Sequence, residues 1–172
     1  YSLHFKAAQT KEPVHIEFLA EAGMDPRKKF TEQFLADTKE PGDLLVYNAA
    51  FERSILNKLQ RDLPQYANEL KERISRIKDL MLPFQSKWYY HPAMKGSYSL
   101  KSVLPALVPE LKYDDMAIGS GGVAMAAFEQ LQNETDMIKI IETREALLQY
   151  CKMDTFAMVK IWEVLEKVTE EK

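Results

Sequence analysis

The chain has 172 residues, of which 46% are hydrophobic and 28% charged, so it can bury a substantial core and is too apolar for wholesale disorder. Its net charge of -3 excludes a strongly basic protein that holds duplex DNA by charge alone. The single cysteine, Cys151, excludes an intrachain disulfide framework and favours a cytoplasmic protein. We expect one domain over residues 1–172, with no membrane-spanning segment.

The first segment of the chain predicts an antiparallel hairpin. Short, partly alternating apolar patterns mark strands over Tyr1–Ala7 and Val14–Leu19, joined by a polar turn over Gln9–Pro13. A helix is expected to begin at Asp25-Pro26, where a capping residue precedes a proline, and to end before Pro41-Gly42.

A strand and two helices are predicted next. The apolar run Leu44–Asn48 is typical of a buried strand, and a helix follows over Ala50–Leu59 until Pro64 breaks the pattern. A third apolar stripe at helical spacing runs as far as Ile77. The segment Ile77–Leu82 fits either the last turn of that helix or a strand, and we favour the strand.

The second half of the chain is predicted to be mainly helical. Pro83–Ser97 is rich in proline, glycine, tyrosine and tryptophan, which is typical of an irregular surface loop. The expected helices are Ser99–Leu107, Val123–Gln132 and Met137–Lys167. Strands interleaved with helices indicate a mixed α/β domain.

An acidic residue interrupts the apolar face of the last predicted helix. Steps of three and four residues from Leu147 to Leu165 meet apolar or aromatic side chains except at Asp154. An ionised carboxylate is costly to bury unless it is paired, hydrogen-bonded or bound to a metal, and a neighbouring arginine or backbone amide would suffice. Tyr150 lies one turn earlier on the same face. Its hydroxyl can reach the same space, although in isolation the residue fits a core position with a polar tip.

A second acidic residue follows the predicted strand Leu44–Asn48. Glu52 falls in the first turn of the next helix, where a carboxylate favours the helix N-terminus, with Asn48 or a nearby residue as the cap. The carboxyl end of a strand is also where ligands and catalytic groups gather in α/β sheets. Glu52 therefore has both a structural and a functional interpretation.

These two acidic stretches resemble known motifs. Asn48–Glu52 resembles the second acidic motif of the DEDD superfamily of 3′-5′ exonucleases, which have a ribonuclease H-like fold, and Tyr150–Asp154 resembles the third, tyrosine-type motif. More closely, the chain is similar to an uncharacterised bacterial domain-of-unknown-function family within that superfamily. The stretches that carry this similarity are Tyr1–His4, Asp25–Arg27, Val46–Glu52, Ile77–Leu80, Gly96–Lys101 and Tyr150–Thr155.

The resemblance implies a metal-dependent nuclease that acts on single-stranded DNA or RNA. In that superfamily four carboxylates hold two divalent ions, and Mg²⁺ or Mn²⁺ prefers such oxygen ligands. By this resemblance Glu52 and Asp154 would bind metal, and Tyr150 would orient the attacking water. The further candidates for contact with substrate are Asn48, which also holds the strand-to-helix turn, Asp79 and Lys101.

The sequence departs from the superfamily pattern at two places. The second motif usually offers aspartate, whereas Glu52 adds a methylene. The first motif, an Asp-x-Glu pair on the first strand, is not found, and Tyr1–Phe5 resembles the second strand. We therefore expect a fragment that lacks its first strand, binds metal weakly, cleaves nothing at a useful rate and self-associates through an unpaired sheet edge.

Two alternatives remain open at this point. A degenerate nuclease fold can serve as a nucleic-acid or protein interaction module, which would be favoured if an apolar strand just before Tyr1 carried no acids. A purely structural domain predicts that the carboxylates of Glu52 and Asp154 lie more than roughly 10 Å apart, too far to share a metal pair. His4 and His15 show no metal-ligand spacing.

Several polar and aromatic side chains have weaker functional interpretations. Ser97 and Ser99 either cap a helix or contact a phosphate. Trp88–Tyr90 either packs under its loop or stacks on the bases of a single strand.

Overall fold

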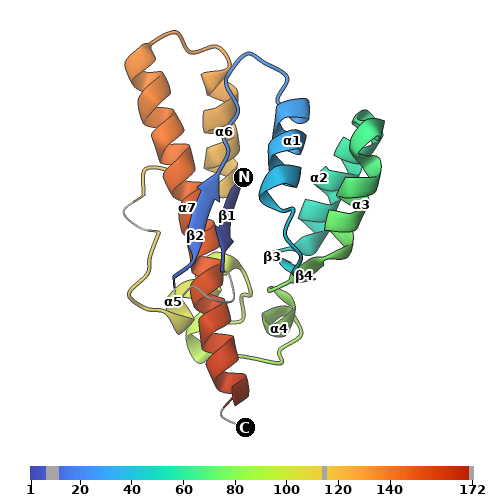
Figure 1. The fold of residues 1–172 in the computed structure, drawn as a ribbon. Helices are drawn as coiled ribbons and strands as arrows, with labels where there is room; N and C mark the ends of the chain where they lie inside the picture. The colour runs from blue at the N-terminus through green and yellow to red at the C-terminus, as the bar shows by residue number, and fades with distance from the viewer. Residues whose placement is uncertain (7–11, 114–115, 171–172) are drawn as a thin grey trace. The chain divides into compact units, whose positions relative to one another are not determined.

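The computed structural model describes residues 1–6, 12–113 and 116–170, and short strands alternate with helices along it. This is the mixed α/β class that the sequence predicts. The elements (Figure 1) are β1 (Ser2–Phe5), β2 (Val14–Glu17), α1 (Arg27–Asp37), β3 (Leu44–Val46), α2 (Ala49–Asp62), η1 (Pro64–Tyr66), α3 (Ala67–Ser75), β4 (Ile77–Asp79), α4 (Leu82–Gln85), η2 (Pro92–Met94), α5 (Leu100–Leu107), α6 (Gly121–Leu131) and α7 (Met137–Glu170).

The chain divides into two compact units. Unit 1 comprises residues 1–24 and 104–172, and unit 2 comprises residues 25–103. The expectation of one domain stays a prediction. No helix in the described part of the chain is both long and apolar enough to cross a bilayer.

Unit 1 combines a strand hairpin with two helices. Strands β1 and β2 pair antiparallel with His4 opposite His15, which confirms the predicted hairpin. Residues 9–11 of its predicted turn lie outside the described residues. Helix α7 packs against both this hairpin and α6. The side chains that α7 buries recur at helical spacing, as an apolar face requires, and they are Leu147, Tyr150, Ala157 and Ile161.

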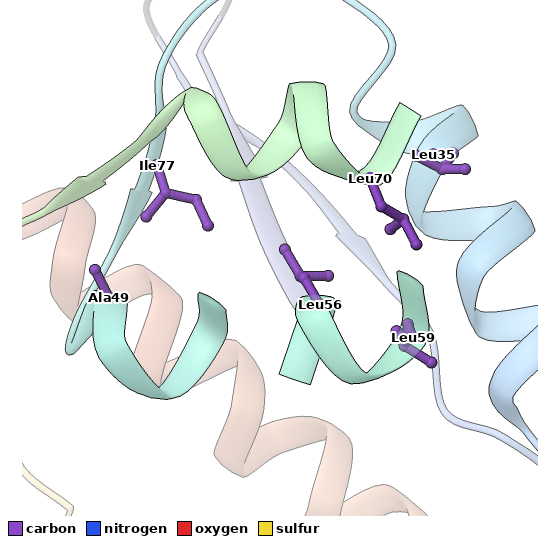
Figure 2. Packing of buried hydrophobic residues seen from close by; sticks show 6 residues of the cluster. All are labelled: Leu35, Ala49, Leu56, Leu59, Leu70 and Ile77. Carbon is purple, nitrogen blue, oxygen red and sulfur yellow. The ribbon is translucent and has the colours of Figure 1, made fainter. Parts of the chain in front are cut away.

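Unit 2 is organised around a parallel strand pair and three helices. Strands β3 and β4 pair with Leu44 beside Ile77 and Val46 beside Asp79, and α2 and α3 connect them. The apolar faces of α1, α2 and α3 meet β4 in one core (Figure 2). Its buried members are Leu35, Ala49, Leu56, Leu59, Leu70 and Ile77.

Two predicted elements differ from the structure in this unit. Helix α3 ends at Ser75 and Ile77 begins β4, so the strand prediction is confirmed, although the strand ends at Asp79 rather than Leu82. The predicted irregular loop after Pro83 instead holds α4 and η2. In both short helices a proline occupies the first turn, and Phe84 is buried at 2% exposure, which anchors α4.

Candidate functional site

The turn from β3 into α2 depends on an unusual backbone conformation at Asn48. This residue has φ 77° and ψ 71°, in the left-handed region, which asparagine tolerates better than most side chains do. Its side chain makes no capping hydrogen bond to α2. The predicted role of Asn48 in the turn therefore comes from its backbone, and its exposed side chain is available for other contacts.

The cap of α2 comes from Asp79, at the end of β4. The Oδ1 atom accepts hydrogen bonds from the backbone N–H of Asn48 at 3.1 Å and of Met81 at 3.0 Å. The Oδ2 atom accepts from the N–H of Ala49 at 2.8 Å. A carboxylate in this position also offsets the positive end of the helix dipole. Both oxygens thus have a structural role, and contact of Asp79 with a substrate stays a prediction.

The other two candidates in unit 2 lie near the starts of helices. Glu52 is in the first turn of α2 and is half-buried, and burial raises the pKa of its carboxyl above the usual value. Lys101 is the second residue of α5 and is also half-buried.

Asp154 lies between two phenols in unit 1. The hydroxyl of Tyr113 donates to Oδ1 of Asp154 at 2.8 Å, and Tyr150 lies one helical turn before Asp154 in α7. The two rings are 6.4 Å apart and only 8% and 6% exposed. Burial, followed by the charge of Asp154, raises the pKa of Tyr150 above its ordinary value. The phenol of Tyr150 therefore gives up its proton less readily than an ordinary tyrosine does.

Tyr113 is a partner of Asp154 that the sequence interpretation did not include. It follows α5 in a stretch without helical or strand periodicity, so no pattern marks it. The spacing from Tyr150 to Asp154, one turn of a helix, is by contrast a signal that the sequence carries.

A polar cluster between the hairpin and α7 was also missed. Ser2 Oγ lies 2.8 Å from His15 Nε2 and 2.9 Å from Thr155 Oγ1. His4 Nδ1 lies 2.8 Å from the same Thr155 oxygen, and the two imidazole rings are 4.8 Å apart. The pairing of β1 with β2, rather than any spacing in the sequence, brings the histidines together. The Oε2 atom of Glu17 lies 3.7 Å from His15 Nε2.

The described residues contain no group of three or more histidine, cysteine, aspartate or glutamate side chains placed to hold a metal ion. Glu52 belongs to unit 2 and Asp154 to unit 1. Their convergence on one metal site stays a prediction.

Comparison with known proteins gives a family for this chain and leaves its chemistry open. The model of a family described as domain of unknown function DUF2779 matches residues 1–99. The uncharacterized protein UU173 of Ureaplasma parvum serovar 3 is 28% identical over an alignment of 171 positions, and the alignment covers 86% of this chain. The chain spans only 25% of the length of that relative. No solved structure matches the chain.

Proposed function

The chain belongs to the DUF2779 family, and we propose that it forms part of a metal-dependent 3′-5′ exonuclease that cuts phosphodiesters in single-stranded or frayed nucleic acid. The observation that carries this proposal is the pair Tyr150 and Asp154 on the buried face of α7. A phenol one helical turn before a half-buried carboxylate matches the tyrosine-type motif that the sequence resembles.

The candidate metal ligands of this chain are of the type that a hard divalent ion prefers, but they are two carboxylates where the resembled superfamily uses four. Glu52 and Asp154 offer the carboxylates that Mg²⁺ and Mn²⁺ prefer. In the resembled superfamily two further carboxylates, from an Asp-x-Glu pair on the first strand, complete the site. Bound there, the ions would activate water and stabilise the leaving oxygen.

The residues of this chain would contribute ligands and one positioning hydroxyl. Glu52 and Asp154 would hold metal, and the Tyr150 hydroxyl would orient a water by hydrogen bonding. Asp79 would act by fixing the start of α2, one turn before Glu52.

We also propose that the fold is ribonuclease H-like. An antiparallel pair at the start of the chain and a parallel pair joined through helices are both compatible with that fold. Within the described residues each strand has one neighbour.

A cleavage assay tests the nuclease function. The protein at its natural length is incubated with a 5′-labelled single-stranded DNA or RNA oligonucleotide and Mn²⁺, and the products are resolved by length. We expect stepwise shortening, reduced more than about 100-fold by Asp154→Asn, since loss of an outer-shell partner alone typically costs about 10- to 100-fold. Glu145→Gln, which removes an exposed acid on the same helix, should cleave like wild type. Equal cleavage by Asp154→Asn would overturn the assignment.

The second acid is tested in the same assay. Glu52→Gln should also lose cleavage, whereas Glu69→Gln, which removes an exposed acid from the first turn of α3, should not. Loss in one acid variant without loss in the other would contradict a shared metal site.

An interaction module is the second candidate function. The hydrogen bond from Tyr113 favours it, because it gives Oδ1 of Asp154 a partner without a metal. This function predicts that the wild-type protein binds oligonucleotide without shortening it in Mn²⁺.

A further inference from the structure

An open cavity of about 360 Å³ lies in unit 2, at the carboxyl end of β3. Its walls come from the strand-to-helix turn at Tyr47-Asn48, from Met81 after β4, and from Ser97–Leu100 at the start of α5. This volume is within the range of about 300–1,000 Å³ that small-molecule sites occupy.

Hydrogen bonds hold the walls of this cavity in place. The Tyr47 hydroxyl donates to the carbonyl of Tyr98 at 2.6 Å, which ties the loop before α5 to the end of β3. The backbone N–H of Ser97 donates to the carbonyl of Met94 at 3.0 Å, and the hydroxyls of Ser99 and Ser102 lie 2.9 Å apart. The cavity is therefore formed before any ligand arrives.

The lining combines an aromatic ring with neutral hydrogen-bonding groups. The Tyr98 ring is 43% exposed, and Asn48 presents an amide that makes no capping bond. Ser97 and Ser99 add hydroxyls. The nearby carboxylate of Asp79 is directed to backbone amides of the same turn. A flat heteroaromatic ring with polar edges complements such a surface, because it can stack on the tyrosine while an amide faces its edge.

We propose that this cavity binds one nucleotide of a single strand, with its base against Tyr98 and its polar edge facing Asn48. The choice of a nucleotide over other ligands of this size rests on the proposed nuclease function. The serine hydroxyls at the cavity wall contact the sugar and phosphate of the same nucleotide. The site thereby holds a strand by its base, independently of any metal.

A binding assay tests the proposal. The full chain is titrated into a fluorescently labelled single-stranded oligonucleotide of about ten nucleotides, and binding is measured by fluorescence anisotropy in the presence of EDTA. Tyr98→Ala should weaken binding about tenfold or more, as expected for loss of a stacked base. Tyr98→Phe keeps the ring and should bind like wild type. Trp162→Ala is the matched control, because Trp162 is 44% exposed, close to the exposed fraction of Tyr98, and lies outside the cavity lining.

A second variant covers the case in which Tyr98→Ala does not fold, as judged by circular dichroism. Asn48→Gly removes the amide and keeps the left-handed backbone, which glycine adopts freely. We expect it to weaken binding several-fold. A nucleoside monophosphate should compete with the oligonucleotide, and inorganic phosphate at the same concentration should not.

Wild-type affinity in both Tyr98→Ala and Asn48→Gly, or no binding by the wild-type chain, would overturn the nucleotide site. Failure of the nuclease proposal can be distinguished from failure of the nucleotide site, because binding is measured without metal and cleavage is measured with it. Loss of binding in Tyr98→Ala together with full cleavage by Asp154→Asn would retain the nucleotide site and reject the metal role of Asp154.

Discussion

Asp79 caps a helix that begins 30 residues earlier in the chain. Its carboxylate, at the end of the neighbouring strand β4, accepts hydrogen bonds from backbone amides at the start of α2. Asp79→Ala should lower the free energy of unfolding by about 1–2 kcal/mol, the usual cost of losing such a cap, as measured by urea denaturation. Asp43→Ala, at an exposed position just before β3, should change it by less than about 0.5 kcal/mol. Similar values for the two variants would contradict the cap.

The phenol of Tyr113 offers another test at the scale of single residues. Tyr113→Phe removes the hydroxyl that donates to Asp154 and keeps the buried ring. A hydrogen bond to a charged group contributes about 1.5–3 kcal/mol, and we expect a loss of that order in urea denaturation. Tyr89→Phe, which alters a half-buried ring elsewhere, should have little effect. Unchanged stability in Tyr113→Phe would show that the carboxylate does not need this donor.

The packing of the hairpin on α7 predicts a pH dependence at the scale of elements. Burial, then the charges of His15 and Lys152, lowers the pKa of His4 from 6.5 to about 4. Burial likewise lowers the pKa of His15, against the opposing charge of Glu17. Below pH 6.5 the unfolded chain takes up a proton that the folded His4 accepts only near pH 4. The stability that the folded protein gains by keeping His4 neutral is therefore complete above pH 6.5 and is lost as the pH falls toward 4.

Urea denaturation at pH 7.5, 6 and 5 measures this effect. The free energy of unfolding should fall less steeply with acid in His4→Gln than in wild type. His91→Gln removes an exposed histidine from unit 2 and should follow the wild-type profile. Parallel profiles for wild type and His4→Gln would contradict the protonation of His4 as the cause.

The elements that could be predicted from the sequence are those that a pattern in neighbouring residues determines. The apolar run of β3 and the apolar spacing of α7 are written in consecutive residues, as is the step from Tyr150 to Asp154. The partners of these residues come from pairing and packing. Asp79 reaches α2 because β4 lies beside β3, and His4 meets His15 through strand register. Tyr113 reaches Asp154 from a stretch without periodicity, which no local pattern could indicate.

The strands of the whole molecule form two separate pairs in the described residues. In β3 the backbone N–H of Leu44 donates to Arg76, and the carbonyl of Val46 accepts from Leu80. Since alternate residues of a strand face the same neighbour, the amide and carbonyl of Leu45 face the opposite edge. An edge without a paired strand is a template for another chain.

We therefore expect residues 1–172 to self-associate as their concentration rises, as measured by sedimentation velocity. Leu45→Pro removes the N–H at the open edge, whereas the hydrogen bonds of Leu44 and Val46 to β4 remain. This variant should shift the distribution toward monomer, and Leu45→Val, which keeps the N–H, should not. Circular dichroism checks that Leu45→Pro is folded. A monomer at every concentration, or equal association in the two variants, would mean that this strand edge does not recruit a second chain.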